Sequence, residues 1–496
     1  MKFESSKQKM KSMSSSLRTP KDLEPYVWRQ IEFLLERKGI GALFVDMGLR
    51  KTSGVLHVIK ALMHRKQLKK PTLIVSTIKV VKLVWRQEAS KWHHTRNFTF
   101  SLVHGNQAER LRALGEEADF YLIGAHNIPW LVELLNNKTD VNNWPFGALI
   151  VDESDLFKSH NAKRFKRLAS VAWLFDHRII MAGTPTPNSM LDIWAQIYIV
   201  DLGRRLGDSF ARFRERFFAH KGYKGFTIVP RHGSEEEIYR IVDDVVLRLD
   251  KEDWITVPKT HYHTPTYVEL PASAMDVYRQ HEEEMFFELD GAETEAISAA
   301  VLSMQCHQMA NGAVYGYDIL TGARTWTAVH NAKAYALDAL VEKADGPVMI
   351  AYWFKHDLAR LKRMYPRAVV FGGKNEEEIE RQWNAGRIRK LLIHPRSGSH
   401  GSNLQFGGRT LIFFSLTWSR GLHDQLVARI GEARAQGEVD IHYIAARHTV
   451  DEAILLAWNR KSNTQRSFLN ALREYREQTL IRLKRTRSAR ALDKRT

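Results

Sequence analysis

Short, continuous apolar runs recur through the first part of the chain, each followed by polar or helical sequence. They are "GALFVD" (41–46), "TLIVST" (72–77), "FYLIG" (120–124), "ALIVDE" (148–153) and "RIIMAGT" (178–184). Continuous rather than alternating hydrophobicity is typical of strands covered on both faces, and the intervening segments are long enough for crossover helices. The pattern therefore predicts one parallel sheet, preceded by an amphipathic helix that starts near Leu23.

The strand pattern fades from about Asp201 to Thr327, where charged amphipathic stretches such as "FARFRERFFAH" predict a helical spacer over 201–327. A second set of apolar runs follows: "PVMIAYW" (347–353), "AVVFG" (368–372), "KLLIHP" (390–395), "RTLIFFSL" (409–416) and "VDIHYIAA" (439–446). We therefore expect two α/β lobes, at 23–200 and 328–472. We expect a disordered basic tail at 1–22 and a flexible basic tail at 473–496.

The net charge of the chain indicates which class of partner it binds. Lys and Arg number 74 and Asp and Glu 56, a net charge of +18. On a soluble chain this surplus favours a polyanion, most often nucleic acid, and a merely basic surface is the alternative. The single cysteine, Cys306, excludes an internal disulfide and a multi-cysteine metal site, and it indicates a reducing cytoplasm. No apolar run reaches the ~20 residues that span a bilayer, so no membrane partner is expected.

The stretch "FVDMGLRKTSG" (44–54) carries the first candidate chemistry. Gly48, Lys51 and Thr52 follow the first predicted strand, as in a loop that holds nucleotide phosphates and Mg²⁺. By itself this pattern also fits a helix N-terminus with an exposed lysine. Asp152 and Glu153 end the fourth predicted strand, where a carboxylate pair can hold the metal and orient the attacking water. The two motifs together predict a nucleotide-hydrolysing site.

The motifs continue in order along the chain, and from about Leu23 to Leu472 it resembles the Swi/Snf-type superfamily 2 helicases, in particular their compact phage-encoded members. The resemblance rests on "LEPYVWRQIEFLL", "FVDMGLRKT", "TLIVSTIKVVKLVWRQEASKW", "YLIGAHNIPWL", "LIVDESDLFKSHNAKRFK", "MAGTPTPNS", "MIAYWFKHDLARL", "LLIHPRSGSHGSNLQFGG" and "LTWSRGLHDQLVARIGEARAQG". It implies two RecA-like lobes with ATP and Mg²⁺ between them, and double-stranded DNA crossing both lobes.

The resemblance also implies roles for individual residues. Those implied for nucleotide binding are Tyr26, Arg29, Gly48, Leu49, Arg50, Lys51 and Thr52. Those implied for catalysis are Lys51, Asp152, Glu153, Gln425 and the arginine finger Arg429, with Thr52 and Asp152 on the metal. Those implied for DNA contact are Lys79, Asn127, Lys355 and Arg396. Those implied for coupling between ATP and DNA are Thr184, Pro185, Gly401 and Asn403. Four tryptophans in these segments either stack on bases or pack in the core: Trp85, Trp92, Trp130 and Trp418.

Three positions depart from the family pattern. Val27 stands where a glutamine reads the adenine, which puts base selectivity in question. Arg50 replaces the glycine before Lys51, a position that favours positive φ and lies near the phosphates. Glu432 stands at the second arginine of the last motif, with Arg434 two residues further on. Arg50 and Glu432 would lie on opposite walls of one cleft, so slow hydrolysis is one expectation.

These observations lead to two hypotheses of different classes. The first is an ATP-dependent translocase on double-stranded or branched DNA, acting with phage replication or recombination proteins in the host cytoplasm. The second keeps the fold and the basic DNA surface but treats the ATP site as decayed. In that case the protein is a DNA-binding or protein-recruiting module.

Overall fold

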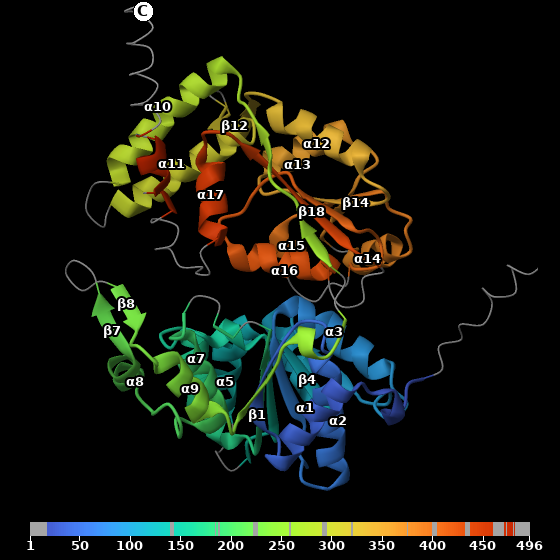
Figure 1. The fold of residues 1–496 in the computed structure, drawn as a ribbon. Coiled ribbons are helices and arrows are strands. Elements are labelled where there is room, and N and C mark those ends of the chain that lie inside the picture. Colours follow the sequence, from blue (N-terminus) through green and yellow to red (C-terminus); the bar gives the residue numbers. More distant parts are fainter. Residues whose placement is uncertain are drawn as a thin grey trace, which may run out of the picture. The chain divides into compact units, whose positions relative to one another are not determined.

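The computed structural model describes residues 17–138, 143–183, 185–186, 189–221, 227–256, 259–289, 295–318, 321–373, 375–398, 404–431, 437–459, 471–472, 474–479 and 481. The chain forms two compact units, Met1–Trp254 and Ile255–Thr496. Each unit has its own parallel sheet with helices on both faces (Figure 1). The predicted fold of two parallel α/β lobes is confirmed.

The sheet of the first unit has the strand order β3-β4-β2-β5-β6-β1-β9, and all neighbouring strands are parallel. Its strands are β1 (Ile40–Val45), β2 (Thr72–Ser76), β3 (Phe100–Val103), β4 (Phe120–Gly124), β5 (Ala148–Asp152), β6 (His177–Ala182) and β9 (Val246–Leu249). Parallel order brings the carboxyl ends of all these strands to one edge, where the loops can share a site.

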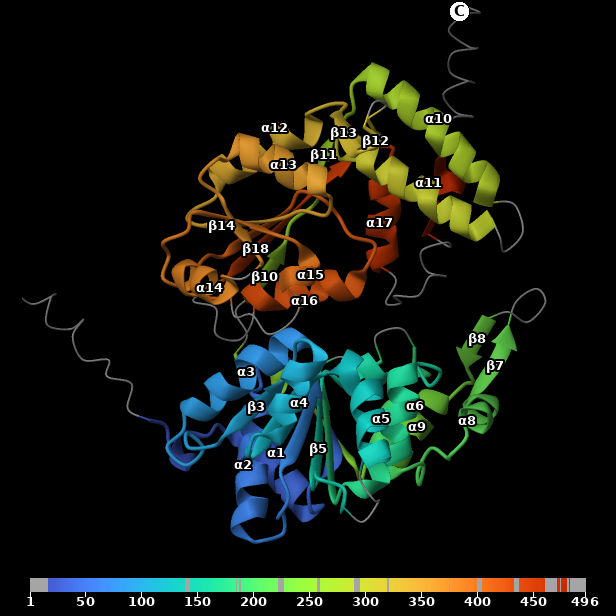
Figure 2. The ribbon, with the colours of Figure 1, turned by 180° about the vertical axis from the view of Figure 1, so that it is seen from behind.

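Helices cover both faces of this sheet (Figures 1 and 2). The helices of this unit are α1 (Pro25–Glu36), α2 (Lys51–His64), α3 (Ile78–Ser90), α4 (Gln107–Gly115), α5 (Ile128–Lys138), α6 (Lys163–Val171), α7 (Asp192–Asp201), α8 (Phe210–Phe217) and α9 (Ser234–Val242). Alternate strand positions such as Phe44, Val75 and Val151 pack with α5, α6 and α7 in one core. The other alternate positions are also fully buried, which is why the strand sequences are apolar throughout. An antiparallel hairpin, β7 (Phe218–Lys221) and β8 (Thr227–Pro230), follows α8, which lies beside the hairpin.

The sheet of the second unit has the order β10-β18-β17-β14-β16-β15, with β11 also paired to β18, and it is parallel throughout. Its strands are β10 (Thr260–Tyr262), β11 (Thr266–Val268), β14 (Val348–Ala351), β15 (Val369–Phe371), β16 (Lys390–Ile393), β17 (Thr410–Phe413) and β18 (Val439–Ala446). Its helices are α10 (Ala272–Leu289), α11 (Glu295–Ala310), α12 (Ala332–Lys343), α13 (Lys355–Met364), α14 (Glu376–Asn384), α15 (Pro395–Gly398), α16 (Arg420–Gly431) and α17 (Val450–Asn459). A second antiparallel hairpin consists of β12 (Ala313–Tyr317) and β13 (Arg324–Ala328).

A buried polar cluster joins three helices of the second unit, α11, α12 and α17. The Lys333 ammonium lies 2.6 Å from an Asp451 carboxylate oxygen and donates to the Asn311 side-chain oxygen at 2.5 Å. His307 lies 3.9 Å from the other Asp451 oxygen, and the side chains of His307, Lys333 and Asp451 are fully buried. Burial lowers the pKa of His307 to about 4, because the charged imidazolium is costly there, although the nearby Asp451 opposes the shift.

The segment 201–327 differs from the helical spacer that the sequence predicts. Its strand β9 pairs with β1 in the first sheet, and β10 and β11 pair with β18 in the second. The boundary between the two units along the chain also falls within this segment, between Trp254 and Ile255. These strands are three or four residues long and lie at sheet edges with exposed positions, so they lack the continuous apolar pattern of central strands.

The predicted disordered tail also ends earlier than expected. Residues 17–22 are described, and Arg18 exchanges backbone hydrogen bonds with Lys91 and His93 beyond α3. The Arg18 guanidinium lies 5.7 Å from the centroid of the Trp92 ring. The predicted flexible C-terminal tail, 473–496, also differs at its start: residues 474–479 are helical, and the buried Tyr475 hydroxyl donates to Glu282 Oε1 at 2.5 Å. Residues 1–16 and 482–496 lie outside the described residues. Among the residues with described structure, no helix is both long and apolar enough to cross a bilayer.

Candidate active site

The loop between β1 and α2 has the backbone of a phosphate-binding loop. Gly48 has φ +92° and Arg50 has φ +52°, both in the left-handed region, and α2 begins directly after them at Lys51. The first N–H groups of a helix have no partner inside the helix, so this end of α2 favours an anion. Lys51 Nζ donates to the carbonyl oxygens of Val45 at 2.6 Å and Asp46 at 3.2 Å, which holds the ammonium group inside the loop.

Arg50 has a protein partner near the loop. Its guanidinium lies 2.9 Å from a carboxylate oxygen of Glu24, the residue before α1. The two side chains are only 15% and 30% exposed, so this ion pair is partly shielded from water. Its left-handed backbone costs roughly 1–2 kcal/mol for a residue other than glycine.

The carboxylate pair lies at the end of β5. The Asp152 side chain is buried and accepts a hydrogen bond from Trp85 Nε1 at 3.1 Å. Burial and the neighbouring Glu153 charge raise the pKa of Asp152 to about 7, and the positive charge of Lys51 acts in the opposite direction. A Cβ atom on Gly183, directly after β6, would lie 3.9 Å from Lys51 Nζ. The ends of β1, β5 and β6 therefore share one site.

A glutamine that the sequence did not single out joins the motif "LIVDESDLFKSHNAKRFK" to the motif "MAGTPTPNS". Ser154 Oγ donates to Gln196 Oε1 at 2.7 Å, and Gln196 Nε2 donates to the carbonyl oxygens of Pro185 at 2.5 Å and Asp192 at 2.9 Å. Gln196 is fully buried within the apolar helix α7. A lone amide in "DIWAQIYIVD" was the available signal, because buried polar groups almost always have a partner.

A second buried glutamine, on α1, contacts the phosphate loop. Gln30 Nε2 donates to the Leu49 carbonyl oxygen at 2.8 Å, and Gln30 and Leu49 are both fully buried. Gly54 of α2 makes room for it, since a Cβ there would lie 3.2 Å from Gln30 Oε1. Val27, one helical turn earlier, is also fully buried, whereas Arg29 is exposed. Gln30 thus connects α1 to the phosphate loop.

Strand β9 and the segment after it contact both the loop after β1 and the start of α1. The Asp46 backbone N–H donates to the Leu249 carbonyl at 3.0 Å, and the Lys251 N–H donates to Asp46 Oδ2 at 3.1 Å. The Trp254 ring packs edge to face on Tyr26, with centroids 6.4 Å apart. Trp254 is 39% exposed whereas Tyr26 is buried. Sequence reasoning missed this contact, because Trp254 lies about two hundred residues after the loop.

Two predicted DNA contacts lie at one edge of the first sheet, because β2 and β4 are neighbours. Lys79 lies in the first turn of α3 and is partly exposed. Asn127 follows β4 and is buried, and its side-chain oxygen accepts a hydrogen bond from Arg110 at 2.9 Å. The Arg110 guanidinium also lies 4.1 Å from the centroid of the Trp130 ring. Asn127 therefore positions a cation that the sequence did not indicate.

The corresponding edge of the second sheet carries the other two predicted contacts. Lys355 begins α13 after β14, and Arg396 lies in α15 after the neighbouring strand β16. Trp353 stacks on His394 with centroids 4.9 Å apart, and the Arg396 guanidinium lies 5.5 Å from the Trp353 centroid. Lys355 and Arg396 are both exposed.

The candidate arginine finger lies on α16. Gln425 and Arg429 are one turn apart on this helix, so their side chains share a face, and both are partly buried. Five residues of interest lie outside the described residues: Thr184, Gly401, Asn403, Glu432 and Arg434. Trp85 and Trp92 are fully buried, as the core-packing interpretation predicts, and Trp130 and Trp418 are partly buried.

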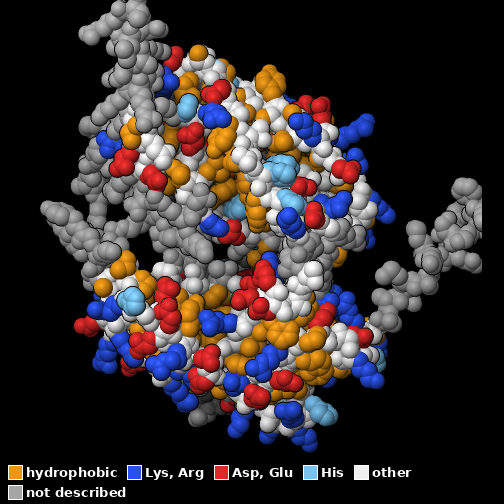
Figure 3. Space-filling model, viewed as in Figure 1, with side chains coloured by type: hydrophobic (Ala, Val, Ile, Leu, Met, Phe, Trp, Pro, Cys, Tyr) orange, Lys and Arg blue, Asp and Glu red, His pale blue; other side chains and the backbone are white. Residues whose placement is uncertain are grey.

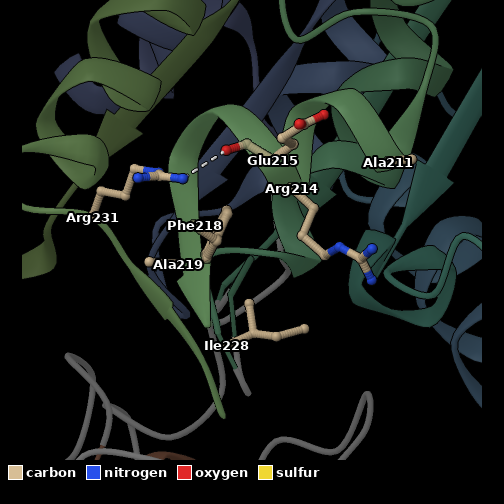
Figure 4. Close-up of a pocket in the computed structure, with 7 residues that line it drawn as sticks. All are labelled: Ala211, Arg214, Glu215, Phe218, Ala219, Ile228 and Arg231. Atoms are coloured by element: carbon tan, nitrogen blue, oxygen red, sulfur yellow. Dashed lines mark hydrogen bonds between the residues drawn. The ribbon is translucent and has the colours of Figure 1, made fainter. Parts of the chain in front are cut away.

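A pocket of about 390 Å³ lies elsewhere in the first unit, between α8 and the β7–β8 hairpin (Figure 4). Arg231 donates to the Glu215 carbonyl oxygen there, while Arg214 points away from that pair. None of the predicted site residues lines this pocket. On the face shown in Figure 3, Lys and Arg side chains are interspersed with Asp and Glu over each unit. Among the described residues, no three or more His, Cys, Asp or Glu side chains gather as a metal site.

A parallel α/β lobe with this loop and carboxylate pair, followed by a second parallel lobe, defines the class of P-loop, helicase-like proteins. The chain belongs to the family of proteins with an SNF2-related domain, which matches residues 26–311.

Several known proteins are similar to the chain. Protein p41 of Acyrthosiphon pisum secondary endosymbiont phage 1 is 36% identical over 467 residues, which cover 90% of this chain and 98% of p41. The uncharacterized ATP-dependent helicase MG018 of Mycoplasma genitalium is 22% identical over 86% of this chain, which spans 40% of that longer relative. The SWI2/SNF2 ATPase core of Sulfolobus solfataricus in complex with double-stranded DNA superimposes with a TM-score of 0.41 at 19% identity, over 90% of this chain and 93% of that one.

Proposed function

We propose that the protein is an ATP-hydrolysing motor that moves along double-stranded or branched DNA. The observation that carries the proposal is the convergence of Lys51, Asp152 and Gly183 at the ends of β1, β5 and β6. The match to the SNF2-related family and the relatives named ATP-dependent helicases support the ATPase assignment.

The residues at this site fit a magnesium-bound nucleotide. The buried Asp152 carboxylate and the Thr52 hydroxyl are oxygen ligands of the kind that Mg²⁺ prefers, and Lys51 supplies the charge that triphosphate oxygens need. When bound, Mg²⁺ would neutralise charge that develops on the phosphates. Glu153, which directly follows Asp152 at the end of β5, is the residue we assign to take a proton from the attacking water.

The base side of the site has a different composition from the family pattern. Val27 offers no hydrogen-bonding amide, and the Tyr26–Trp254 pair provides aromatic surface instead. Aromatic contact recognises the plane of any nucleobase, whereas an amide reads the hydrogen-bonding edge of one base. We assign Trp254, with Tyr26, to the base end of the nucleotide site and Gly48, Leu49 and Arg50 to the phosphate end.

Hydrolysis would use residues of the second unit as well. Arg429, with Gln425 one turn before it, is the candidate arginine finger that stabilises charge on the transferring phosphate. Movement along DNA would follow if nucleotide binding and release change the grip of the two units on the DNA backbone. The backbone contacts assigned to this grip are Lys79, Lys355, Arg396 and Arg110, which Asn127 holds in place. Pro185, Thr184, Gly401 and Asn403 are assigned to coupling.

The similarity to phage protein p41 supports a phage context for the chain. We propose that the motor acts in phage DNA replication or recombination, in the host cytoplasm and together with other phage proteins. Contacts to the DNA backbone read no sequence, so the motor would act on DNA of any sequence. Because Val27 has no amide to read the edge of adenine, we expect the site to accept nucleotides other than ATP as well.

A second candidate is a DNA-binding or protein-recruiting module with weakened hydrolysis. The observation in its favour is Arg50, a non-glycine residue with φ +52° directly before Lys51. Phosphate release measured with and without duplex DNA separates the two functions. The motor predicts stimulation by DNA that the Lys51→Ala variant lacks. Release that never exceeds the Lys51→Ala level would favour the module.

A further inference from the structure

The β12–β13 hairpin of the second unit presents aromatic and cationic side chains on one face. In its antiparallel register Tyr315 pairs with Trp326, and Tyr317 pairs with Arg324. Directly paired residues lie on the same face, and residues two apart along a strand share that face. The four side chains therefore form one surface, the hairpin face, which lies beside α13 (Figure 2).

The hairpin face is fixed to the helix that begins with a proposed DNA contact. The Lys355 backbone N–H, at the start of α13, donates to the Tyr315 hydroxyl at 2.9 Å. The Tyr315 and Trp326 rings also pack on the buried His356, with centroids 5.1 and 6.3 Å apart. The position of the hairpin relative to the exposed Lys355 side chain is therefore defined by several contacts.

Two cations lie next to the rings, and Lys355 contributes a third from the start of α13. The Arg324 guanidinium lies 4.5 Å from the Tyr315 centroid, and the Arg363 guanidinium lies 5.5 Å from the Trp326 centroid. Arg324, Lys355 and Arg363 are all exposed. Rings that hold guanidinium groups in place leave their N–H donors available for a phosphate. Asp318, in the hairpin turn, accepts hydrogen bonds from the Thr321 N–H and hydroxyl.

Tyr317 differs from the two packed rings of the hairpin face. Its side chain is 73% exposed, whereas Tyr315 and Trp326 are partly buried. Arg324 lies directly opposite Tyr317 in the strand register. A solvent-exposed ring beside exposed cations is the combination with which proteins hold unpaired bases, because the ring stacks on any base while the cations bind the backbone.

We propose that the hairpin face binds single-stranded DNA, with Tyr317 stacked on an unpaired base and Arg324, Lys355 and Arg363 on the phosphates. The inference rests on the proposed motor, because it extends the DNA contact assigned to Lys355. It adds a substrate preference: the protein engages DNA where a duplex meets an unpaired strand. A duplex alone would not offer Tyr317 a base to stack on.

Binding of the full-length protein to a single strand that contains 2-aminopurine tests this inference. Stacking on an aromatic ring quenches 2-aminopurine fluorescence, and anisotropy gives the affinity. Tyr317→Ala should remove the quenching and weaken single-strand binding by roughly 5- to 150-fold, the range for loss of one stacking contact. Tyr317→Phe, which keeps the ring, should bind as the unaltered protein does. Tyr335→Ala removes an equally exposed tyrosine of α12, also 73% exposed, and should have no effect.

The cations are tested by salt dependence. Arg324→Gln and Arg363→Gln should each lower the slope of log affinity against log salt by about 0.7 for a single strand. Arg381→Gln, which removes an exposed arginine that pairs with Glu378 on α14, serves as the matched control.

Several outcomes would overturn the inference. They are a Tyr317→Ala variant that binds the single strand within twofold of the unaltered protein, an equal loss in Tyr335→Ala, and an equal loss on blunt duplex DNA. The last result would make the face a backbone contact only. Failure of the motor proposal is read separately, from duplex-stimulated phosphate release against Lys51→Ala, so the two failures are distinguishable.

Discussion

The guanidinium group of Arg50 lies 2.9 Å from a carboxylate oxygen of Glu24. The arginine that replaces the glycine before Lys51 is therefore paired with an acid at the start of α1. This acid partly neutralises the positive charge next to the phosphate loop. The Arg50 charge also contributes to the lowered pKa of Glu88 in α3. We therefore expect the pair to reduce the attraction between Arg50 and a triphosphate.

Glu24→Gln should tighten the binding of a fluorescent ATP analogue by roughly fivefold, because the positive charge of Arg50 would no longer be offset. The gain should disappear in the Glu24→Gln, Arg50→Gly double variant. Glu32→Gln, which changes an exposed acid of the same helix, is the control. Weaker binding by Glu24→Gln would mean that the pair holds Arg50 out of the way of the phosphates.

Trp254→Ala should weaken ATP binding by about 3- to 10-fold, the usual loss for one aromatic pair. Inorganic tripolyphosphate should bind as before, since it has no base to contact the Tyr26–Trp254 pair. Trp28→Ala removes a similarly exposed tryptophan of α1, 42% against 39%, and is the matched control. Competition titrations give both affinities. Equal losses for ATP and tripolyphosphate would contradict the assignment to the base.

Gln196→Ala should uncouple the segment after Asp152 and Glu153 from the segment after β6, because Ser154 and Pro185 both bond to this amide. We expect a loss of about 1–3 kcal/mol in the free energy of unfolding, the cost of an unpartnered buried hydroxyl. The ratio of DNA-stimulated to unstimulated phosphate release should fall. Gln87→Ala, at an exposed position of α3, is the control. An unchanged ratio at reduced stability would limit Gln196 to a structural role.

Arg110→Ala should weaken duplex DNA binding and lower the salt slope by about 0.9, the effect of one lost phosphate contact. Asn127→Ala should weaken binding less, because it frees the arginine without removing its charge. Arg112→Ala removes an exposed arginine from the same helix and tests whether position or charge alone matters. Anisotropy titrations at several salt concentrations measure the slopes. Identical slopes for Arg110→Ala and Arg112→Ala would remove Arg110 from the interface.

The buried His307 should make the second unit less stable in mild acid. Its pKa is about 4 in the folded protein and 6.5 in the unfolded chain, so between these values only the unfolded chain takes up the proton. The stability present above pH 6.5 is lost as the pH falls, by about 2 kcal/mol at pH 5 for this group. His356, Lys333, Asp357 and Asp451 face the imidazole and have to be kept unchanged in the test.

Hydrogen exchange of α11 at pH 7 and pH 5, corrected for intrinsic rates, measures this loss. His307→Gln should remove about 2 kcal/mol of the pH dependence, although it also lowers stability at pH 7. His281→Gln, at a position of α10 whose side chain is 38% exposed, should leave the pH dependence unchanged. A pH dependence in His307→Gln equal to that of the unaltered protein would assign the effect to other groups.

The central strands of both sheets could be recognised from local sequence, because burial on both faces requires a continuous apolar run such as that of β1 or β17. The order of the motifs along the chain also identified the family. Edge strands could not be recognised in this way, because they are not buried at every position. In β9 only some positions face the core, and Arg248 remains exposed, so no continuous run marks the strand.

By itself, the sequence determined the class of fold, the phosphate loop and the carboxylate pair, since these depend on residues that are close together along the chain. Only the tertiary structure decided which distant side chains meet them. Glu24 reaches Arg50, Gln196 joins Ser154 to Pro185, and Trp254 lies on Tyr26. Such contacts join separate elements of the fold, and local patterns of polarity contain no information about which elements become neighbours.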